Sequence, residues 1–472
     1  MSQAPNENRR KRGWRVGVSL IAVLFTLVAG GPAAWAHPVS TASEPNAVLQ
    51  WNLIASEAAT RACLAPGGDP MHESRMYVMM HLAIHDSLNA IQPRFAPYTF
   101  HGRGTGADLE AAVSSASRTV LISVLRDLQE SVPTGCIERS VELVESSYAA
   151  ALDDMPNRSA KVRGIAVGRS AAFEILSDRV LDGSERLKAS HSTRTGSAGG
   201  SDASDYPWKQ WSQVTPFMPA ASNDLRPKPP DHSSPEYTED FNEIQALGGD
   251  GFLTETTRTP QQSATALFWR QSPPLTWNAI ARTVARTRQL DIFDSARLFG
   301  LLNLAMADGY ITAAVIAESP ASAWAAVRAG EGDRNESTDG DHRWTPLTGT
   351  DPLTDHESAH ALQSAAAATV LAGVLETDNV AIAVCSATAL SGHRCKDKDP
   401  EYRYYDSFSH AATETGSAQV LSGRQFSFAV KASMLRGTQV GVQALDRSLS
   451  LNTPALAQHC YPPPPGGSSD HC

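Results

Sequence analysis

Helical periodicity runs through most of the chain and restricts its fold more than any other feature. Apolar residues recur every three or four positions, as on one face of an α-helix, and the strict alternation typical of a β-strand is scarce. This spacing predicts helices over residues 47–61, 75–93, 107–131, 137–154, 158–182, 257–269, 274–290, 292–329, 357–377, 406–421 and 425–447. We therefore expect an all-α protein.

Two long interruptions separate the predicted helices. Residues 188–236 are rich in Ser, Gly, Pro and Trp, and residues 330–356 are rich in Gly, Asp and Thr. The first is too long for an ordinary connection between helices, so we expect an ordered irregular cover or a partly disordered segment. The predicted parts are an N-terminal helical part (37–187), the irregular insertion (188–236), a C-terminal helical part (237–450) and a Pro-rich tail (451–472).

The N-terminus has the pattern of a secretory signal peptide. A basic stretch from Arg9 to Arg15 precedes an apolar run from Val18 to Val28, and Ala34-Trp35-Ala36 matches an A-x-A cleavage site. No later apolar run approaches the roughly 18 residues that a membrane-spanning helix needs. We therefore expect residues 1–36 to be removed and the mature protein to be soluble and extracellular.

The chain holds six cysteines, an even number that favours disulfides in an exported protein. A thiolate metal site is the rival interpretation, but no C-x-x-C motif supports it. Proximity in the sequence favours the pairs Cys385 with Cys395, Cys460 with Cys472 and, from the remaining two, Cys63 with Cys136.

The charge balance argues against nucleic acid as a partner. The formal net charge is −10, from 40 basic and 50 acidic residues. Such a chain lacks the basic surface that attracts nucleic acid or an anionic membrane. We expect a small-molecule substrate and no nucleic-acid partner, and the sequence leaves a homodimer open.

Residues 356–360 read His-Glu-Ser-Ala-His and match HExxH, the short signature of zinc peptidases. On a helix, His356 and His360 would lie one turn apart and could share Zn²⁺ while Glu357 polarises a bound water. A zinc peptidase needs a third ligand, and the nearest downstream helical candidate, Glu376, lacks a family-type spacing. We therefore expect no metal site here.

An ordered set of short motifs extends over nearly the whole mature chain. It resembles the bacterial branch of the vanadium-dependent haloperoxidases, which share their fold with the type 2 phosphatidic acid phosphatases. The resemblance implies an all-α fold of two packed helical bundles, with the pocket at the ends of the predicted helices in the C-terminal part. The motifs are Trp51-Asn52, Met80 to Ile91, Gly164 to Gly168, Phe241 to Gly248, Phe268-Trp269, Trp277 to Ala281, Leu302 to Asp308, Trp344 to Leu347 and Tyr405 to Phe408.

The resemblance gives residues 350–361 a different meaning from HExxH. The family segment T-P-P-F-P-E-Y-P-S-G-H-S aligns without a gap to T-D-P-L-T-D-H-E-S-A-H-A. Ser358 then matches the family's oxyanion-binding serine and His360 its acid–base histidine, while Glu357 falls just before the helix. For each residue, a purely structural role is the alternative. Ser358 could only cap the helix, His360 could be a histidine bonded in a closed pocket, and Glu357 could only stabilise the helix dipole.

The other positions that would bind the anion in the family carry neutral or acidic residues. Glu318 and Ala325 replace a lysine and an arginine, Gln419 replaces an arginine, and Gln425 replaces the histidine bonded to vanadium. Each charge-assisted hydrogen bond is worth about 1.5–3 kcal/mol, so losing the bonds of the lysine and the two arginines costs about 5–9 kcal/mol. That is a fall of roughly 10³ to 10⁶ in affinity. We therefore expect no cofactor and no bound vanadate, unless Arg424, Arg403 or Lys431 rebuilds the cationic site.

The leading hypothesis is a secreted, haloperoxidase-like enzyme that no longer uses vanadate. His360, with Glu357 or Glu318, would transfer protons on an uncharged organic substrate, and isomerisation, cyclisation or rearrangement of a secondary metabolite would fit. Ser358 completes the predicted catalytic set. The predicted substrate-binding residues are Gln419, Gln425 and Arg424.

Three alternatives stay open. The chain could be a non-catalytic binding protein on the same scaffold. It could be an active vanadium haloperoxidase or phosphatase with a rebuilt anion site. The last alternative is a zinc hydrolase that acts through HESAH.

Overall fold

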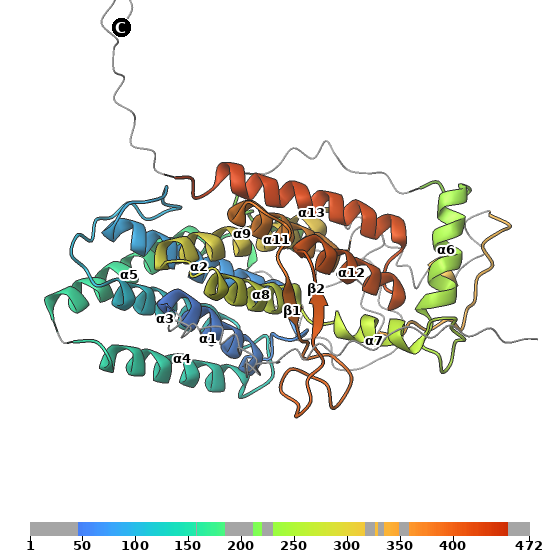
Figure 1. The fold of residues 1–472 in the computed structure, drawn as a ribbon, viewed down its shortest axis with the longest axis horizontal. Helices are drawn as coiled ribbons and strands as arrows, with labels where there is room; N and C mark the ends of the chain where they lie inside the picture. The colour runs from blue at the N-terminus through green and yellow to red at the C-terminus, as the bar shows by residue number, and fades with distance from the viewer. Residues whose placement is uncertain are drawn as a thin grey trace, which may run out of the picture. The chain divides into compact units, whose positions relative to one another are not determined.

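Figure 1 shows the computed structural model of the protein, which describes residues 46–156, 158–184, 211–219, 230–316, 326–328, 335–348 and 358–451. All of these residues belong to one compact unit, Ser43–Cys472. The predicted signal peptide, most of the predicted insertion and the tail beyond Leu451 lie outside the described residues.

The described chain is almost entirely helical, as the periodicity predicts. The helices before the insertion are α1 (Ala47–Arg61), α2 (Pro70–Ile91), α3 (Leu109–Asp127), α4 (Cys136–Asp153) and α5 (Ser159–Asp178). Those after it are α6 (Pro235–Gly248), α7 (Pro260–Phe268), α8 (Pro273–Thr287), α9 (Ile292–Ile316), α11 (Ala359–Leu375), α12 (Phe408–Leu421) and α13 (Ser427–Arg447). The prediction of an all-α fold is therefore confirmed.

Three elements are absent from the prediction. Helix α6 begins two residues inside the predicted insertion, where Pro235 follows the N-cap Ser234. Strands β1 (Ile382–Val384) and β2 (Arg403–Tyr405) pair antiparallel, with Ile382 opposite Tyr405. Strands of three residues are too short to show a periodic pattern.

Short polar side chains begin many of the helices. Asn46, Asp69, Asp108, Ser358 and Ser407 each accept a hydrogen bond from a backbone N–H in the first turn of the helix that follows. Such a cap supplies one of the partners that the first turn lacks. The helix starts are thus set locally, by residue type.

Helix α11 packs against α9 and α13, and α9 packs in turn against α2 (Figure 1). The close approach of α13 depends on glycine. A Cβ atom at Gly437 would overlap the carbonyl oxygen of Leu362, and one at Gly441 would come within 2.8 Å of the carbonyl oxygen of Ala366. This packing buries the N-terminal turn of α11.

A buried polar network ties the helices on either side of the insertion together. The Asn52 amide lies 2.7 Å from His81 Nε2 and donates to Asn278 at 2.7 Å. Asn278 donates in turn to Asn303 at 2.8 Å. These residues come from α1, α2, α8 and α9. Four of the motifs that carry the family resemblance therefore have a structural use, because buried amides need partners.

One described part of the predicted insertion, residues 211–219, packs on the helical core. Trp211 and Phe217 are buried. The backbone N–H groups of Phe217 and Met218 each donate to the Asp308 carboxylate on α9 at 2.7 Å. This segment therefore packs against α9 at Asp308.

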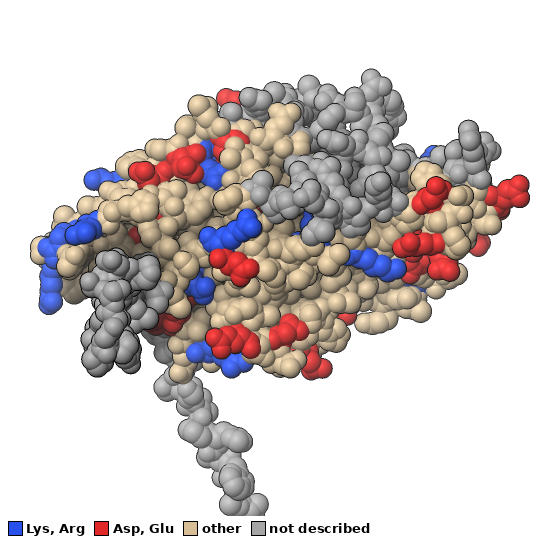
Figure 2. All heavy atoms as spheres, turned by 90° about the horizontal axis from the view of Figure 1, so that it is seen from above, with Lys and Arg blue, Asp and Glu red and all other residues tan. Residues whose placement is uncertain are grey.

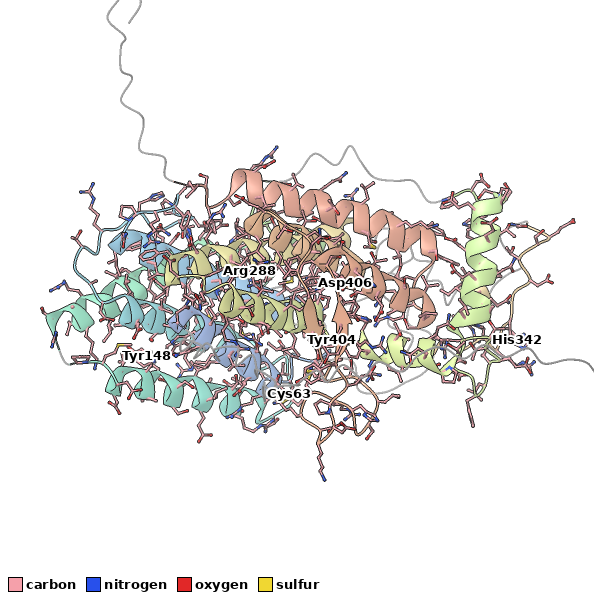
Figure 3. All side chains as sticks on the ribbon, in the orientation of Figure 1. Cys63, Tyr148, Arg288, His342, Tyr404 and Asp406 are labelled. Carbon is pink, nitrogen blue, oxygen red and sulfur yellow. A yellow bond between two sulfur atoms is a disulfide. The ribbon has the colours of Figure 1, made fainter. Side chains whose placement is uncertain are left out.

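Two of the three predicted disulfides are confirmed. Cys63, labelled in Figure 3 near the end of α1, is bonded to Cys136 at the start of α4, and Cys385 is bonded to Cys395 in the loop between the two strands. The third predicted pair, Cys460 with Cys472, lies outside the described residues.

Helix length and surface charge are the features that bear on a membrane or nucleic-acid partner. Among the helices described, none has the length and apolar character to cross a bilayer. On the face shown in Figure 2, Lys and Arg side chains lie among Asp and Glu side chains rather than in one basic patch.

Candidate functional site

Ser358 caps the helix that carries His360. Its hydroxyl accepts a hydrogen bond from the backbone N–H of Ala361 at 3.3 Å, and its own N–H donates to the Ser433 hydroxyl on α13 at 2.6 Å. Ser358 is 2% exposed. The structure therefore places Ser358 in the capping role and fixes the start of α11 against α13.

His360 is the second residue of α11 and is only 7% exposed. Its Nε2 atom has no hydrogen-bond partner among the residues that the structure describes. Burial, and next the positive charge of Arg424, lower the pKa of the imidazole to about 3, while a hydrogen bond to the backbone of Arg270 opposes them. The ring is therefore neutral at ordinary pH. If the other nitrogen binds Arg270, Nε2 is left as a hydrogen-bond acceptor.

Arg424 lies in the turn between α12 and α13, where its N–H donates to the Gln419 carbonyl oxygen at 3.0 Å. Its charge acts on His360 and also on Tyr310, whose pKa it lowers. The other two candidate cations lie elsewhere. Arg403 on β2 binds Glu414 at 2.8 Å, and Lys431 is exposed on α13. Of these three cations, Arg424 is the one whose charge acts on His360.

The two predicted glutamines also belong to this turn. Gln419 is buried on α12, where its amide donates to the Thr415 carbonyl oxygen at 3.4 Å. Gln425 is buried, and its N–H donates to the Gln419 carbonyl oxygen at 3.3 Å. The Gln419 carbonyl oxygen thus accepts from both Arg424 and Gln425 and holds the turn that contains Arg424.

Glu318, Glu357 and His356 lie outside the described residues. Helix α11 begins at Ala359, so HExxH is not a continuous stretch of this helix. Glu376 caps the opposite end of α11. Among the residues that are described, no three or more His, Cys, Asp or Glu side chains gather as a metal site.

Glu73 on α2 is a functional candidate that the sequence did not reveal. It is fully buried, its Oε2 accepts a hydrogen bond from the Ser272 hydroxyl at 2.7 Å, and its Oε1 has no partner among the described residues. Burial raises its pKa to about 8; the Ser272 hydrogen bond opposes this rise and the Asp69 charge adds to it. In the sequence Glu73 looks like an acidic residue of a helix's first turn, which needs no function.

Tyr310 on α9 is influenced by the charges of both Glu73 and Arg424. Its hydroxyl is buried and has no partner among the described residues. Burial, and then the charges of Glu73 and Asp69, raise the pKa of the hydroxyl well above its usual value, while Arg424 lowers it. Tyr310 thus lies within electrostatic reach of both charged residues.

The loop between α7 and α8 contacts two of these residues. The backbone of Arg270 binds His360, and the Ser272 hydroxyl donates to Glu73. The charges of Glu73 and Arg424 both act on Tyr310, and the charge of Arg424 also acts on His360. We call Glu73, Tyr310, His360 and Arg424 the interior polar cluster. Its atoms offer hydrogen-bond donors, an acceptor and one nearby cation, which suits proton transfer on a polar organic group.

Comparison with known proteins shows that three of the four residues of this cluster fall in a stretch that matches a family model. Residues 299–453 match the family described as the VCPO second helical-bundle domain. That stretch includes Tyr310, His360 and Arg424, whereas Glu73 lies before it. Among curated proteins, no sequence matches this chain.

Solved structures extend the likeness over most of the chain. The first bacterial vanadium-dependent iodoperoxidase has a TM-score of 0.66 at 17% identity, covering 85% of this chain and 97% of its own. A holo-type bacterial vanadium-dependent chloroperoxidase has a TM-score of 0.61 at 14% identity, covering 84% and 94%. The apo-type enzyme gives 0.59 at 13% identity, covering 80% and 93%. The chain therefore has the vanadium haloperoxidase fold, and its residues 299–453 match the family model of the VCPO second helical-bundle domain.

Proposed function

We propose that this protein is a secreted enzyme on the haloperoxidase scaffold that performs acid–base chemistry on a small uncharged organic substrate without vanadate. Isomerisation, cyclisation and rearrangement are the reaction types that fit. The observation that carries the proposal is the state of His360, a buried, neutral imidazole whose Nε2 has no partner among the described residues. Such an atom can accept a hydrogen bond from a polar group of a bound molecule.

The described residues near His360 do not fit vanadate. An oxyanion is held by several cations through charge-assisted hydrogen bonds. Here Gln419 and Gln425 are neutral, and the Ser358 hydroxyl accepts a bond from the start of α11. Arg424 is the one basic side chain whose charge acts on His360 within the part of the chain that is described. This donor set suits a neutral polar ligand better than a multiply charged anion.

In the proposed reaction, the chain's own residues bind and polarise the substrate. His360 would accept a hydrogen bond from a substrate hydroxyl at Nε2, because its other nitrogen faces the Arg270 backbone. The Arg424 charge would stabilise negative charge that develops on a substrate oxygen in this buried site. Burial strengthens both effects because it excludes water.

A vanadate titration tests the proposal. Purified mature protein is incubated with orthovanadate, hydrogen peroxide and bromide, and bromination of monochlorodimedone is followed by absorbance. We expect no vanadate-dependent bromination, and elemental analysis should find neither vanadium nor zinc at one atom per chain. Bromination that saturates with vanadate, or stoichiometric zinc, would overturn the proposal.

A rebuilt anion site is the second candidate function, because the Arg424 charge acts on His360. In that case vanadate would bind, and Arg424→Gln would weaken the binding by at least tenfold through loss of a charge-assisted hydrogen bond. Lys431→Gln, which changes an exposed charge on the neighbouring helix α13, is the matched control.

A further inference from the structure

We propose that the Glu73 carboxylate is the base of this site, and that it removes the α-proton of a ketone or aldehyde whose oxygen binds the Tyr310 hydroxyl. The inference rests on the proposed acid–base function and adds a substrate class to it. It also assigns His360 the role of a hydrogen-bond acceptor rather than the base.

The Ser272 hydroxyl binds one oxygen of Glu73 instead of capping its own helix. Ser272 is the N-cap residue of α8, yet its side chain makes no capping hydrogen bond there. Its hydroxyl instead donates to Glu73 Oε2 at 2.7 Å, while its N–H donates to the Pro66 carbonyl oxygen at 2.6 Å. Since Oε2 is anchored, the carboxyl group is oriented and Oε1 is left to react.

The first turn of α2 supports this orientation and keeps the carboxyl basic. Asp69 caps the helix through His72 N–H at 3.1 Å, and its second oxygen lies 2.6 Å from His72 Nδ1. Asp69 is therefore committed to His72, and its negative charge, after burial, helps to raise the pKa of Glu73 to about 8. A general base works best when its pKa lies close to the working pH. By contrast, the His360 imidazole, with a pKa of about 3, is a weak base.

The packing of α9 on α11 places Tyr310 and His360 on neighbouring turns. The Gln363 amide donates to the Met306 carbonyl oxygen at 2.8 Å, and a Cβ at Gly309 would contact Leu362. These contacts bring the part of α9 around Met306 against the part of α11 around Gln363. Tyr310 lies one turn after Met306 on α9, and His360 lies one turn before Gln363 on α11.

Several buried side-chain atoms have no hydrogen-bond partner among the described residues. Three of them belong to the interior polar cluster: Glu73 Oε1, Tyr310 Oη and His360 Nε2. Buried polar atoms are almost always paired, so their grouping points to a bound polar molecule. A ketone oxygen would accept from Tyr310 Oη, and a hydroxyl elsewhere on the substrate would donate to His360 Nε2.

The proton transfer balances without a further reagent. Glu73 Oε1 takes the proton from the α-carbon, the C–H electron pair forms the carbon–carbon double bond, and the carbonyl π pair moves onto oxygen. The resulting enolate accepts from Tyr310 Oη, and the Arg424 charge stabilises it. Return of the proton to the same carbon gives exchange, and its return to a conjugated carbon gives an isomer. Either return restores the carboxylate.

Hydrogen exchange tests the assignment without the natural substrate. The full mature chain is incubated with cyclohexanone or acetophenone in D₂O, and loss of the α-proton signal is followed by NMR. We expect the protein to accelerate exchange over buffer, with a rate that rises with pH and levels off above the Glu73 pKa of about 8. Glu73→Gln should lower the rate about 100-fold or more, the usual contribution of a general base.

Matched variants separate the base from the scaffold. Glu110→Gln changes an exposed first-turn glutamate of α3 and should leave the rate unchanged. Tyr310→Phe should slow exchange without shifting its pH profile, and His360→Gln should keep the rate within about tenfold, since neither removes the base. Circular dichroism confirms that each variant is folded.

Each contrary outcome has a distinct meaning. Wild-type exchange at the buffer rate for both ketones overturns the Glu73 assignment. Loss of exchange in His360→Gln but not in Glu73→Gln also overturns it, and makes His360 the base of the proposed function. The vanadate titration judges the proposed function separately, because it does not depend on which residue is the base.

Discussion

Four buried ionisable residues are neutral over a shared pH range. Burial raises the pKa of Glu73 to about 8 and that of Asp308 to about 7. Burial also lowers the pKa of His81 and His360 to about 3. Between these two sets of values all four groups are uncharged. The interior around α2, α9 and α11 therefore avoids the cost of isolated buried charges.

Glu73→Gln should change the pH dependence of stability. The folded-state pKa of Glu73 lies above the ordinary value of 4.5, so the folded protein holds this proton more tightly than the unfolded chain. The stabilisation that this proton contributes is fully present below pH 4.5 and is lost as the pH rises toward about 8. Over that range the free energy of unfolding falls by at most about 1.4 kcal/mol per pH unit. Glutamine cannot ionise, so the variant should lose this slope.

Urea unfolding across that pH range measures the effect, with Glu110→Gln as the exposed control. The wild-type free energy of unfolding should fall more steeply with pH than that of Glu73→Gln. Parallel pH dependences in the two proteins would show that Glu73 is not buried as a protonated acid.

At the scale of elements, the contact between α11 and α13 positions the candidate site. Ser433 on α13 accepts from the Ser358 N–H at the start of α11, and glycines let the two backbones approach. His360 follows in the same turn of α11. A shift of α13 would therefore move the imidazole relative to α9 and the turn that holds Arg424.

Gly437→Ala should destabilise the protein by about 1–3 kcal/mol, the usual cost of adding a methyl group to a packed interior. The new Cβ would overlap the Leu362 carbonyl oxygen, which is backbone and cannot move alone. Thr438→Ala, at the next and exposed position of α13, should change stability by less than about 0.5 kcal/mol. Thermal unfolding compares the two, and equal losses would contradict the close approach.

Most elements could be predicted because their causes are local. Helix α1 has the predicted bounds, and the caps Asn46 and Ser358 are recognisable residue types. Helix α6 was missed because it begins inside a Pro- and Ser-rich stretch that reads as a loop. The strands β1 and β2 were missed because each is held by its partner rather than by its own pattern.

At the scale of the whole molecule, the two confirmed disulfides act over different lengths of chain. Cys63 and Cys136 are 73 residues apart, whereas Cys385 and Cys395 are 10 apart. The first bond joins α1 to α4, and the second closes a local loop. In the chain-entropy view, the longer closed loop restricts the unfolded chain more.

Replacing both Cys63 and Cys136 with serine should therefore lower the free energy of unfolding by about 4 kcal/mol. The same change at Cys385 and Cys395 should cost about 3 kcal/mol, because the closed loop is shorter. Urea unfolding of the two double variants measures the difference. A larger loss for the shorter loop would show that native contacts, rather than chain entropy, decide the effect.

The sequence by itself determined the helical fold, the likeness to the haloperoxidases, two disulfide pairs and the position of His360 at the start of a helix. Each of these follows from spacing or residue type along a short stretch. Only the tertiary structure decided which groups surround His360. Glu73 and Tyr310 come from separate helices and look ordinary in sequence, since burial and proximity in the fold give them their protonation states and the atoms that have no partner among the described residues. Arg424 is predicted from the sequence, and only the fold makes its charge act on His360 and Tyr310.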